Sequence, residues 1–153
     1  MLGKLSEEEV VELLESNTIG RIGCSNGETT YVVPVSYVVK DGYVLCHSRL
    51  GLKIELMREN PSVCFEVDEI SDYGNWRCVI AWGSYKEIQN EDEINEALNH
   101  FSDHTLTMKT NQTAEPPAEL EGRTHPGHKL NYGAPIFYKI EFTQVTGRFE
   151  KSL

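Results

Sequence analysis

The first apolar stretch of the chain has the period of a helix. From Val10 onward, apolar residues fall at positions i, i+3 and i+4, which gives one face that packs against another element. Ser6 and Glu9 complete the Ser-x-x-Glu pattern of a capping box, in which each side chain satisfies a free backbone N–H. The pattern therefore predicts a helix over residues 6–16.

Most of the other apolar segments are short and strand-like, and glycine-containing turns separate them. Asn26-Gly27 and Asp41-Gly42 both tolerate the positive φ of a tight hairpin turn. Pro61 disfavours a helical residue before it and so ends a short helix. The predicted strands are residues 19–24, 29–39, 43–48, 63–67, 76–88 and 136–142, and the further predicted helices are residues 52–59 and 91–104.

The segment 76–88 is apolar on both of its faces. A strand of this kind fits a barrel wall whose outer side is covered by a helix or by a second subunit. One face carries Trp76, Cys78, Ile80 and Trp82, and the other carries Val79, Ala81 and Tyr85.

The order of these elements predicts a mainly β (α+β) fold with antiparallel strands, a few short helices and one domain over residues 1–153. Residues 105–135 have little periodicity and contain several prolines and glycines, so we expect a long loop there.

Charge and hydropathy narrow the possible partners. With 24 acidic and 14 basic residues, the chain has a formal charge of −10, which repels nucleic acid. Its longest apolar run, Tyr31–Val39, is too short to cross a membrane, and Glu7–Glu9 lie where a signal peptide needs positive charge. We therefore expect a cytoplasmic protein that binds neither nucleic acid nor membrane.

The cysteines and histidines do not predict a metal site. No two cysteines have the Cys-x-x-Cys spacing, so we expect reduced thiols that act as small hydrophobes. Two histidines four residues apart lack the Glu of a His-Glu-x-x-His motif, which favours solvent-facing side chains and leaves a metal or haem site as the alternative. The residues are Cys24, Cys46, Cys64 and Cys78, the pair His100 and His104, and His125 and His128 in the predicted loop.

The segment 43–56 runs from a strand through a short loop into a helix, and this geometry favours an anion. The first helical N–H groups have no intrahelical partner and the helix dipole adds positive charge there. Ser48, Arg49 and Lys53 can complete a phosphate pocket, and Gly51 allows a ligand to approach closely. Many strand-loop-helix joints contain a lysine, so the spacing alone is weak.

Four motifs together resemble one known family, the flavin mononucleotide (FMN)-binding split barrels related to pyridoxamine 5′-phosphate oxidase. The chain is most similar to the short branch that includes the nitroimidazole-resistance proteins. The resemblance implies an antiparallel split β-barrel of Greek-key type. The motifs are Val-Pro-Val-Ser-Tyr at 33–37, His-Ser-x-x-Gly-x-Lys at 47–53, Asn-Pro at 60–61 and the strand 76–83.

The resemblance also implies roles for individual residues in a homodimer whose flavin site lies at the subunit interface. Lys53 and Ser48 would bind the FMN phosphate, while His47 would lie near the flavin as the candidate catalytic residue. Leu52 stands where many members have an arginine or another polar residue, a departure that implies either a lower phosphate affinity or compensation by Arg49. The ring would be lined by the backbone and side chains of Val35, Ser36 and Tyr37, and the partner subunit would supply Trp76 and Arg77; with Gly51, these complete the expected cofactor-binding set.

The implied activity is that of an FMN-dependent oxidoreductase passing electrons from a reduced nicotinamide to a small acceptor of nitroaromatic or quinone type. The flavin would carry the redox chemistry, and the protein would bind and orient it. Two alternatives remain: a flavin- or haem-binding module without turnover, and a homodimeric interaction protein with an empty site. A loop at 105–135 that leaves room for a second molecule favours catalysis, and one that fills the site favours binding alone.

Overall fold

The computed structural model describes residues 1–108 and 134–153, which form seven strands and three helices. No helix in these two ranges is both long enough and apolar enough to span a bilayer. In chain order the elements are β1 (Leu2–Lys4), α1 (Glu7–Ser16), β2 (Ile19–Ser25), β3 (Thr30–Lys40), β4 (Tyr43–Ser48), α2 (Leu52–Glu59), β5 (Ser62–Asp72), β6 (Asn75–Ile88), α3 (Glu91–Met108) and β7 (Ile136–Glu150).

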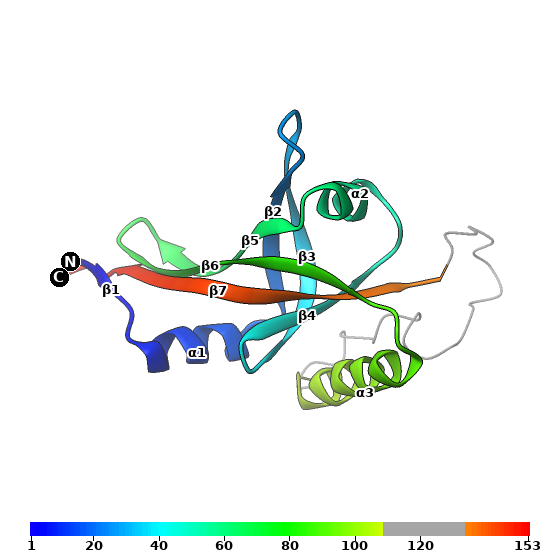
Figure 1. Ribbon diagram of the computed structural model, residues 1–153. Coiled ribbons are helices and arrows are strands. Elements are labelled where there is room, and N and C mark those ends of the chain that lie inside the picture. The colour runs from blue at the N-terminus through cyan, green and yellow to red at the C-terminus, as the bar shows by residue number, and fades with distance from the viewer. Residues whose placement is uncertain (109–133) are drawn as a thin grey trace, which may run out of the picture.

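The strands pair antiparallel in the order β1-β7-β4-β3-β2-β5-β6, and a further pairing of β6 with β7 closes the sheet into a barrel (Figure 1). The long β6–β7 ladder runs from Trp76 opposite Glu150 to Ile88 opposite Phe137. β1 adds only to the C-terminal end of β7, so six strands form the barrel wall. The predicted mainly β, antiparallel split barrel is therefore confirmed.

The two hairpin turns are built as the sequence predicts. Gly27 and Gly42 have φ values of 93° and 82°, a region that favours glycine. Asn26 supports the first turn, because its side-chain oxygen accepts the backbone N–H groups of Glu28 and Thr29 at 3.1 and 2.8 Å.

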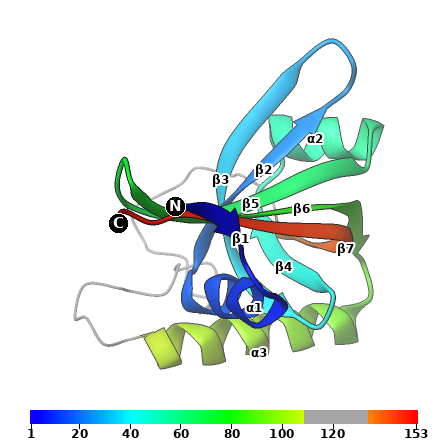
Figure 2. The ribbon, with the colours of Figure 1, turned by 90° about the vertical axis from the view of Figure 1, so that its left-hand side faces the viewer.

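Apolar side chains from all six strands of the barrel wall fill its interior, and α1 and α2 add to this core from opposite sides (Figures 1 and 2). Helix α3 packs instead on the outside of the barrel, where Ala97 and Phe101 join Val38, Leu45 and Phe137 in a second apolar cluster. Helix α3 thus covers only the part of the barrel's outer surface that these residues form.

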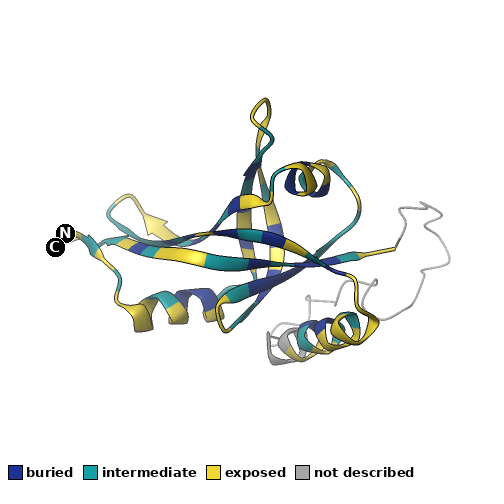
Figure 3. Ribbon diagram, viewed as in Figure 1, coloured by how far each residue is buried: buried dark blue, intermediate teal, exposed yellow. Residues whose placement is uncertain are grey.

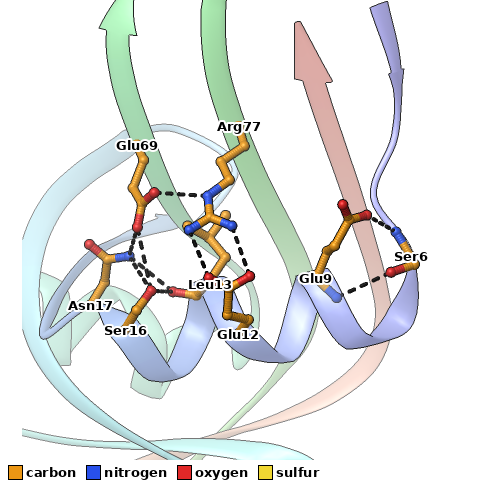
Figure 4. Close-up of polar contacts among 8 residues, drawn as sticks. All are labelled: Ser6, Glu9, Glu12, Leu13, Ser16, Asn17, Glu69 and Arg77. Carbon is orange, nitrogen blue, oxygen red and sulfur yellow. Dashed lines mark hydrogen bonds and ion pairs between the residues drawn. The ribbon is translucent and has the colours of Figure 1, made fainter. Parts of the chain in front are cut away.

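Helix α1 is held at both ends by polar contacts (Figure 4). At its start Ser6 and Glu9 form the predicted capping box, with bonds of 2.7 and 3.2 Å. Toward its end, Arg77 of β6 pairs with Glu69 of β5 at 2.8 Å and with Glu12 of α1 at 3.1 Å. These contacts fix α1 against the β5–β6 pair.

Two strands extend well beyond their predicted ends. β5 continues through acidic residues to Asp72, because Arg21 pairs with Glu66 and Asp68 while Arg77 pairs with Glu69. β7 continues through its polar second half because β6 offers a ladder along its whole length. Helix α3 begins as predicted and extends to Met108, and most of the predicted loop 105–135 lies outside the described residues.

Candidate functional site

The candidate site lies where β3 and β4 separate. Their ladder runs from Lys40 opposite Tyr43 to Tyr37 opposite Cys46 and stops there. Before this point β3 pairs with β2 alone, and after it β4 pairs with β7 alone. The two strand edges between 35–36 and 47–48 thus face a split in the barrel wall.

The backbone of β3 presents hydrogen-bonding groups to this split. The N–H of Tyr37 donates to the carbonyl of Thr18 at 3.0 Å, on the side of β2. Successive N–H groups of a strand point to opposite sides, so the N–H of Ser36 points toward the split. The backbone of β3 thus offers an N–H donor on the side of the split.

The end of β4 leads directly into α2, and residues 47–53 form what we call the β4–α2 corner. Helix α2 begins after Gly51, which has an extended backbone and provides no side-chain cap, so the first helical N–H groups receive no side-chain oxygen. An added Cβ at Gly51 would meet no atom within 4 Å, which shows open space at this point. The corner has the geometry predicted for binding an anion.

Lys53 supplies the positive charge of this corner. Its side chain is half-buried, and within the part of the chain that the structure describes it makes no ion pair. Desolvation lowers the pKa of the ammonium, while the neighbouring thiols of Cys46 and Cys24 act in the opposite direction. A half-buried cation without a carboxylate is stabilised by any anion that binds beside it.

Three other polar side chains near the corner, those of Ser48, Arg49 and Arg58, already make contacts within the chain. Ser48 donates its hydroxyl proton to the carbonyl of Arg49 at 2.9 Å, and Arg49 itself interacts with another part of the chain. Arg58, in the last turn of α2, pairs with Glu87 of β6 at 2.8 Å. Of the predicted phosphate residues, Lys53 is therefore the one whose charge is available without breaking a contact.

His47 is held by aromatic rings at the end of β4. Its ring lies edge-on to Phe101 of α3, with centroids 4.8 Å apart, and tilted against Phe137 of β7 at 6.0 Å. The side chain is half-buried. These contacts fix its orientation, so α3 positions the candidate catalytic residue.

The side chains of Val35 and Tyr37 do not line the site as expected. Both are buried in the barrel core, since they lie on the inward face of β3, and Tyr37 donates its hydroxyl proton to the carbonyl of Leu14 in α1 at 2.6 Å. Burial raises the pKa of this phenol well above its ordinary value. Of the three expected ring-lining residues, only Ser36 presents its side chain outside the core.

Trp76 and Arg77 lie at the start of β6, whereas the β4–α2 corner of the same chain is near its other end, since Ile88 and His47 both pair with Phe137. Trp76 donates its indole N–H to Glu150 at 3.1 Å. The guanidinium of Arg77 pairs with the carboxylates of Glu69 in β5 and Glu12 in α1, and these ion pairs raise the pKa of Arg77. Within its own chain the charge of Arg77 is used by these two ion pairs, and its contribution to the flavin site of the partner subunit stays a prediction.

A residue that the sequence analysis did not single out lies beneath the corner. Tyr138 of β7 is fully buried, and its hydroxyl makes no well-formed hydrogen bond with the described residues. Burial raises the pKa of the neighbouring Cys46 thiol to about 12, and both Tyr138 and Lys53 act to lower it. The strand period predicts that Tyr138 points inward, but gives no sign of this polar cluster.

The histidines provide no metal site in the described part of the chain. His100 of α3 lies 3.7 Å from Glu96, and no group of three potential metal ligands occurs among the described residues. The side chain of His104, and His125 and His128 entirely, lie outside the described residues.

The chain is similar to known proteins over almost its whole length. A family model described as pyridoxamine 5′-phosphate oxidase matches residues 6–149. An uncharacterised protein of Rhizobium meliloti (strain 1021) is 27% identical over 152 residues, covering 94% of this chain and 92% of that protein. A crystal structure described as an FAD-binding protein of Mesorhizobium loti is 28% identical, with a TM-score of 0.71 and 99% of each chain covered.

The nitroimidazole-resistance branch that the sequence predicts is represented by a solved structure of lower sequence identity. A crystal structure described as a candidate 5-nitroimidazole antibiotic resistance protein of Bacteroides thetaiotaomicron VPI-5482 has a TM-score of 0.71 at 18% identity, and covers 97% of this chain and 87% of that one. A likeness at this identity shows the fold, which several other solved structures share.

The placement of Tyr37 predicts a structural role for its hydroxyl. Tyr37→Phe removes a buried hydrogen bond, so the free energy of unfolding falls by about 1 kcal/mol, as measured by urea denaturation. Tyr31→Phe is the control, because this half-buried tyrosine has no hydroxyl hydrogen bond within the described residues. Loss of bound flavin from Tyr37→Phe at unchanged stability would contradict the assignment.

Proposed function

The chain belongs to the pyridoxamine 5′-phosphate oxidase family, and we propose that it is a flavin-dependent oxidoreductase, active as a homodimer, that passes electrons from a reduced nicotinamide to a small acceptor. The Mesorhizobium loti relative, described as FAD-binding, supports a flavin nucleotide, and the resemblance implies FMN. A nitroaromatic or quinone acceptor follows from the resemblance to the nitroimidazole-resistance branch.

The observation that carries this proposal is the available charge of Lys53 beside the uncapped start of α2. FMN and FAD share a phosphate at the ribityl 5′ position. Placed at the β4–α2 corner, this phosphate accepts N–H groups from the first turn of α2 and neutralises the half-buried ammonium. The bound anion offsets the desolvation that lowers the pKa of Lys53, so the corner fits a phosphate better than it fits water.

The split between β3 and β4 is the proposed place for the flavin ring. The ring carries hydrogen-bonding atoms on its rim, which match the N–H of Ser36 and the free strand edges. When bound, the flavin supplies the redox chemistry. The chain binds its phosphate, orients its ring and places His47, held by Phe101, at the edge of the split.

The homodimer is proposed from the outer face of the barrel that α3 leaves bare. Strand pairing places two rows of side chains across β3, β2, β5 and β6, and we call them the outer face. Along β2 and the first half of β5, buried residues alternate with residues that are not buried (Figure 3). Val32 and Trp82 in the first row are 64% and 41% exposed, which is unusual for large apolar side chains on a strand. The rows are Val32, Gly23, Cys64 and Trp82, followed by Pro34, Arg21, Glu66 and Ile80.

The outer face also connects the dimer to the cofactor. Ser36 lies on the same face of β3 as Val32 and is the cross-strand partner of Ile19, which is 62% exposed. A second copy that covers the outer face therefore reaches the rim of the split. Trp76 lies on the same face of β6 as Trp82 and remains the residue that we propose the partner contributes.

Replacing Lys53 tests the phosphate site. Lys53→Met removes a charge-assisted contact, so flavin affinity falls by about 10- to 100-fold, as measured by titration of the apoprotein with fluorescence detection. The matched control is Lys40→Met, a half-buried lysine at the far end of β3 that makes no ion pair within the described residues. Equal flavin affinity in wild type and Lys53→Met would refute the proposed site.

Reduction of the holoprotein tests the enzymatic proposal. Under anaerobic conditions, excess reduced nicotinamide cofactor bleaches the visible flavin absorbance within seconds to minutes if the split admits the nicotinamide beside the ring. Chemical reduction with dithionite is the control for a reducible flavin. A flavin that dithionite bleaches and neither NADH nor NADPH reduces identifies the chain as a flavin-binding module and excludes the proposed donor.

A charge on the outer face tests the dimer. Val32→Asp places a carboxylate in the proposed interface, so the species measured by light scattering falls from twice 17.3 kDa to the mass of one chain. Its flavin affinity falls too, because the partner closes the site. Val11→Asp is the control, since Val11 on α1 is 50% exposed and lies outside the outer face. A monomeric wild type, or a Val32→Asp variant that stays dimeric, rejects this interface.

A further inference from the structure

The outer face consists of two halves that fit each other. β3 and β2 form one half, β5 and β6 form the other, and Arg21 lies opposite Glu66 where the halves meet. A half-turn about a line along the strands between β2 and β5 stacks this face on the same face of a second copy. It places β6 over the partner's β3 and β5 over the partner's β2. Each residue then lies over the residue at the opposite place in the same row of the partner.

The first row is complementary in shape under this half-turn. Val32 and Trp82, at the two ends of the row, are 64% and 41% exposed, and each is covered by the other from the second copy. Between them, the half-buried side chain of Cys64 lies over Gly23, which has no side chain. The two exposed apolar side chains are thus removed from water without a clash in the middle of the row.

The second row is complementary in charge. Within one chain Arg21 pairs with Glu66 at 3.0 Å and with Asp68 at 3.3 Å. The half-turn places Arg21 of each copy over Glu66 of the other, so that charges of alternating sign surround the axis. A half-turn about a line across the strands would keep β2 over β2 and β5 over β5, and would bring no Arg21 over a Glu66. The charges therefore favour the axis that runs along the strands.

The same half-turn carries the start of β6 to the split of the second copy. Ser36 on β3 and Cys78 on β6 each lie two residues beyond the second row, on the outward side of their strands. Cys78 of one copy therefore lies over Ser36 of the other, at the rim of the split. Trp76 lies one row further, where α3 covers Val38 and the open surface of β3 ends.

We infer that two copies stack in this way, about a two-fold axis that runs along the strands between β2 and β5, and that Cys78 and Trp76 of each copy cover the split of the other. This inference rests on the proposed flavin site and dimer, and names how the two chains are arranged. The stacking brings Trp76 to the split without use of the family resemblance. It adds Cys78, whose thiol donates to Glu66 at 3.4 Å.

Cross-linking tests the arrangement. Thr30 and Ser84 lie two residues outside the first row, at its opposite ends, so Thr30 of one copy is expected over Ser84 of the other. In a Cys64→Ser/Cys78→Ser background, Thr30→Cys/Ser84→Cys is expected to form covalent dimers with a bismaleimide that spans about 10 Å, the spacing of stacked sheets. Neither single variant is expected to do so, because like positions lie on opposite sides of the axis.

The same reagent tests the contact at the split. Ser36→Cys, in a Cys64→Ser background, is expected to be linked to Cys78 of the other copy, and Ser36→Cys/Cys78→Ser is the control. A dimer in which the Thr30 and Ser84 positions are linked but the Ser36 position is not overturns the placement of Cys78. A dimer that binds flavin and in which no pair, or a single variant alone, is linked overturns the axis and leaves the proposed function standing. A monomeric wild type overturns the proposed dimer itself.

Two charge reversals test the second row. Arg21→Glu gathers carboxylates around the axis and Glu66→Arg gathers guanidinium groups, so each variant alone is expected to dimerise at least about tenfold more weakly than the wild type, as measured by sedimentation. An equal mixture of the two is expected to recover most of this loss as a heterodimer, because opposite charges then face each other across the axis. The pair within each chain stays broken in both variants, so the recovery reports contact between chains. A mixture that dimerises no better than its components overturns the charge pairing.

Discussion

The separation of β3 from β4 is the constraint on which the candidate site depends. A closed antiparallel barrel satisfies its backbone groups by strand pairing, and the β6–β7 ladder achieves this closure along thirteen paired positions. The β3–β4 ladder ends at Tyr37 and Cys46, and beyond it the facing strand edges need another partner. The polar edge of the split, the loop after β4 and the start of α2 all follow from this point.

Burial of Lys53 at the start of α2 lowers the pKa of its ammonium, and an anion bound beside it would offset this desolvation. The chain is strongly acidic, with a formal charge of −10, and yet the ammonium makes no ion pair in the described ranges. Two arginines on the barrel, by contrast, are paired: Arg21 with Glu66, and Arg58 with Glu87. Folding thus leaves the half-buried ammonium of Lys53 without a paired carboxylate in the described ranges, at a helix start that favours negative charge.

Local signals in the sequence were sufficient to predict most elements. The capping box at Ser6 and the turns at Gly27 and Gly42 depend on neighbouring residues, so helix and hairpin starts were predicted correctly. The full lengths of β5 and β7 were not, because their polar halves are held by β6 and by arginines far away in sequence. Long-range pairing of this kind leaves no periodic apolar signal.

The candidate site was predictable as a segment and less so as a set of side chains. The segment 47–53 forms the expected corner, but strand alternation divides the neighbouring residues between two faces. Ser36 faces outward whereas Tyr37 enters the core, and Trp76 lies on the outer face whereas Arg77 turns toward α1. Adjacent residues of one motif therefore lie on opposite faces of a strand. A motif that is recognised from the sequence does not show which of its residues faces the site.

The proposed dimer and the proposed cofactor site share one strand pair, which couples them energetically. Ser36 at the split and Ile19 beside the outer face are cross-strand partners, so a partner subunit that covers Ile19 also limits solvent access to the flavin ring. A ligand that binds the assembled form more tightly than the separate chains stabilises the assembly by the same factor. If the proposed dimer closes the proposed site, flavin affinity rises with protein concentration wherever the dimer is in equilibrium with the monomer, and flavin in turn lowers the concentration at which the dimer forms.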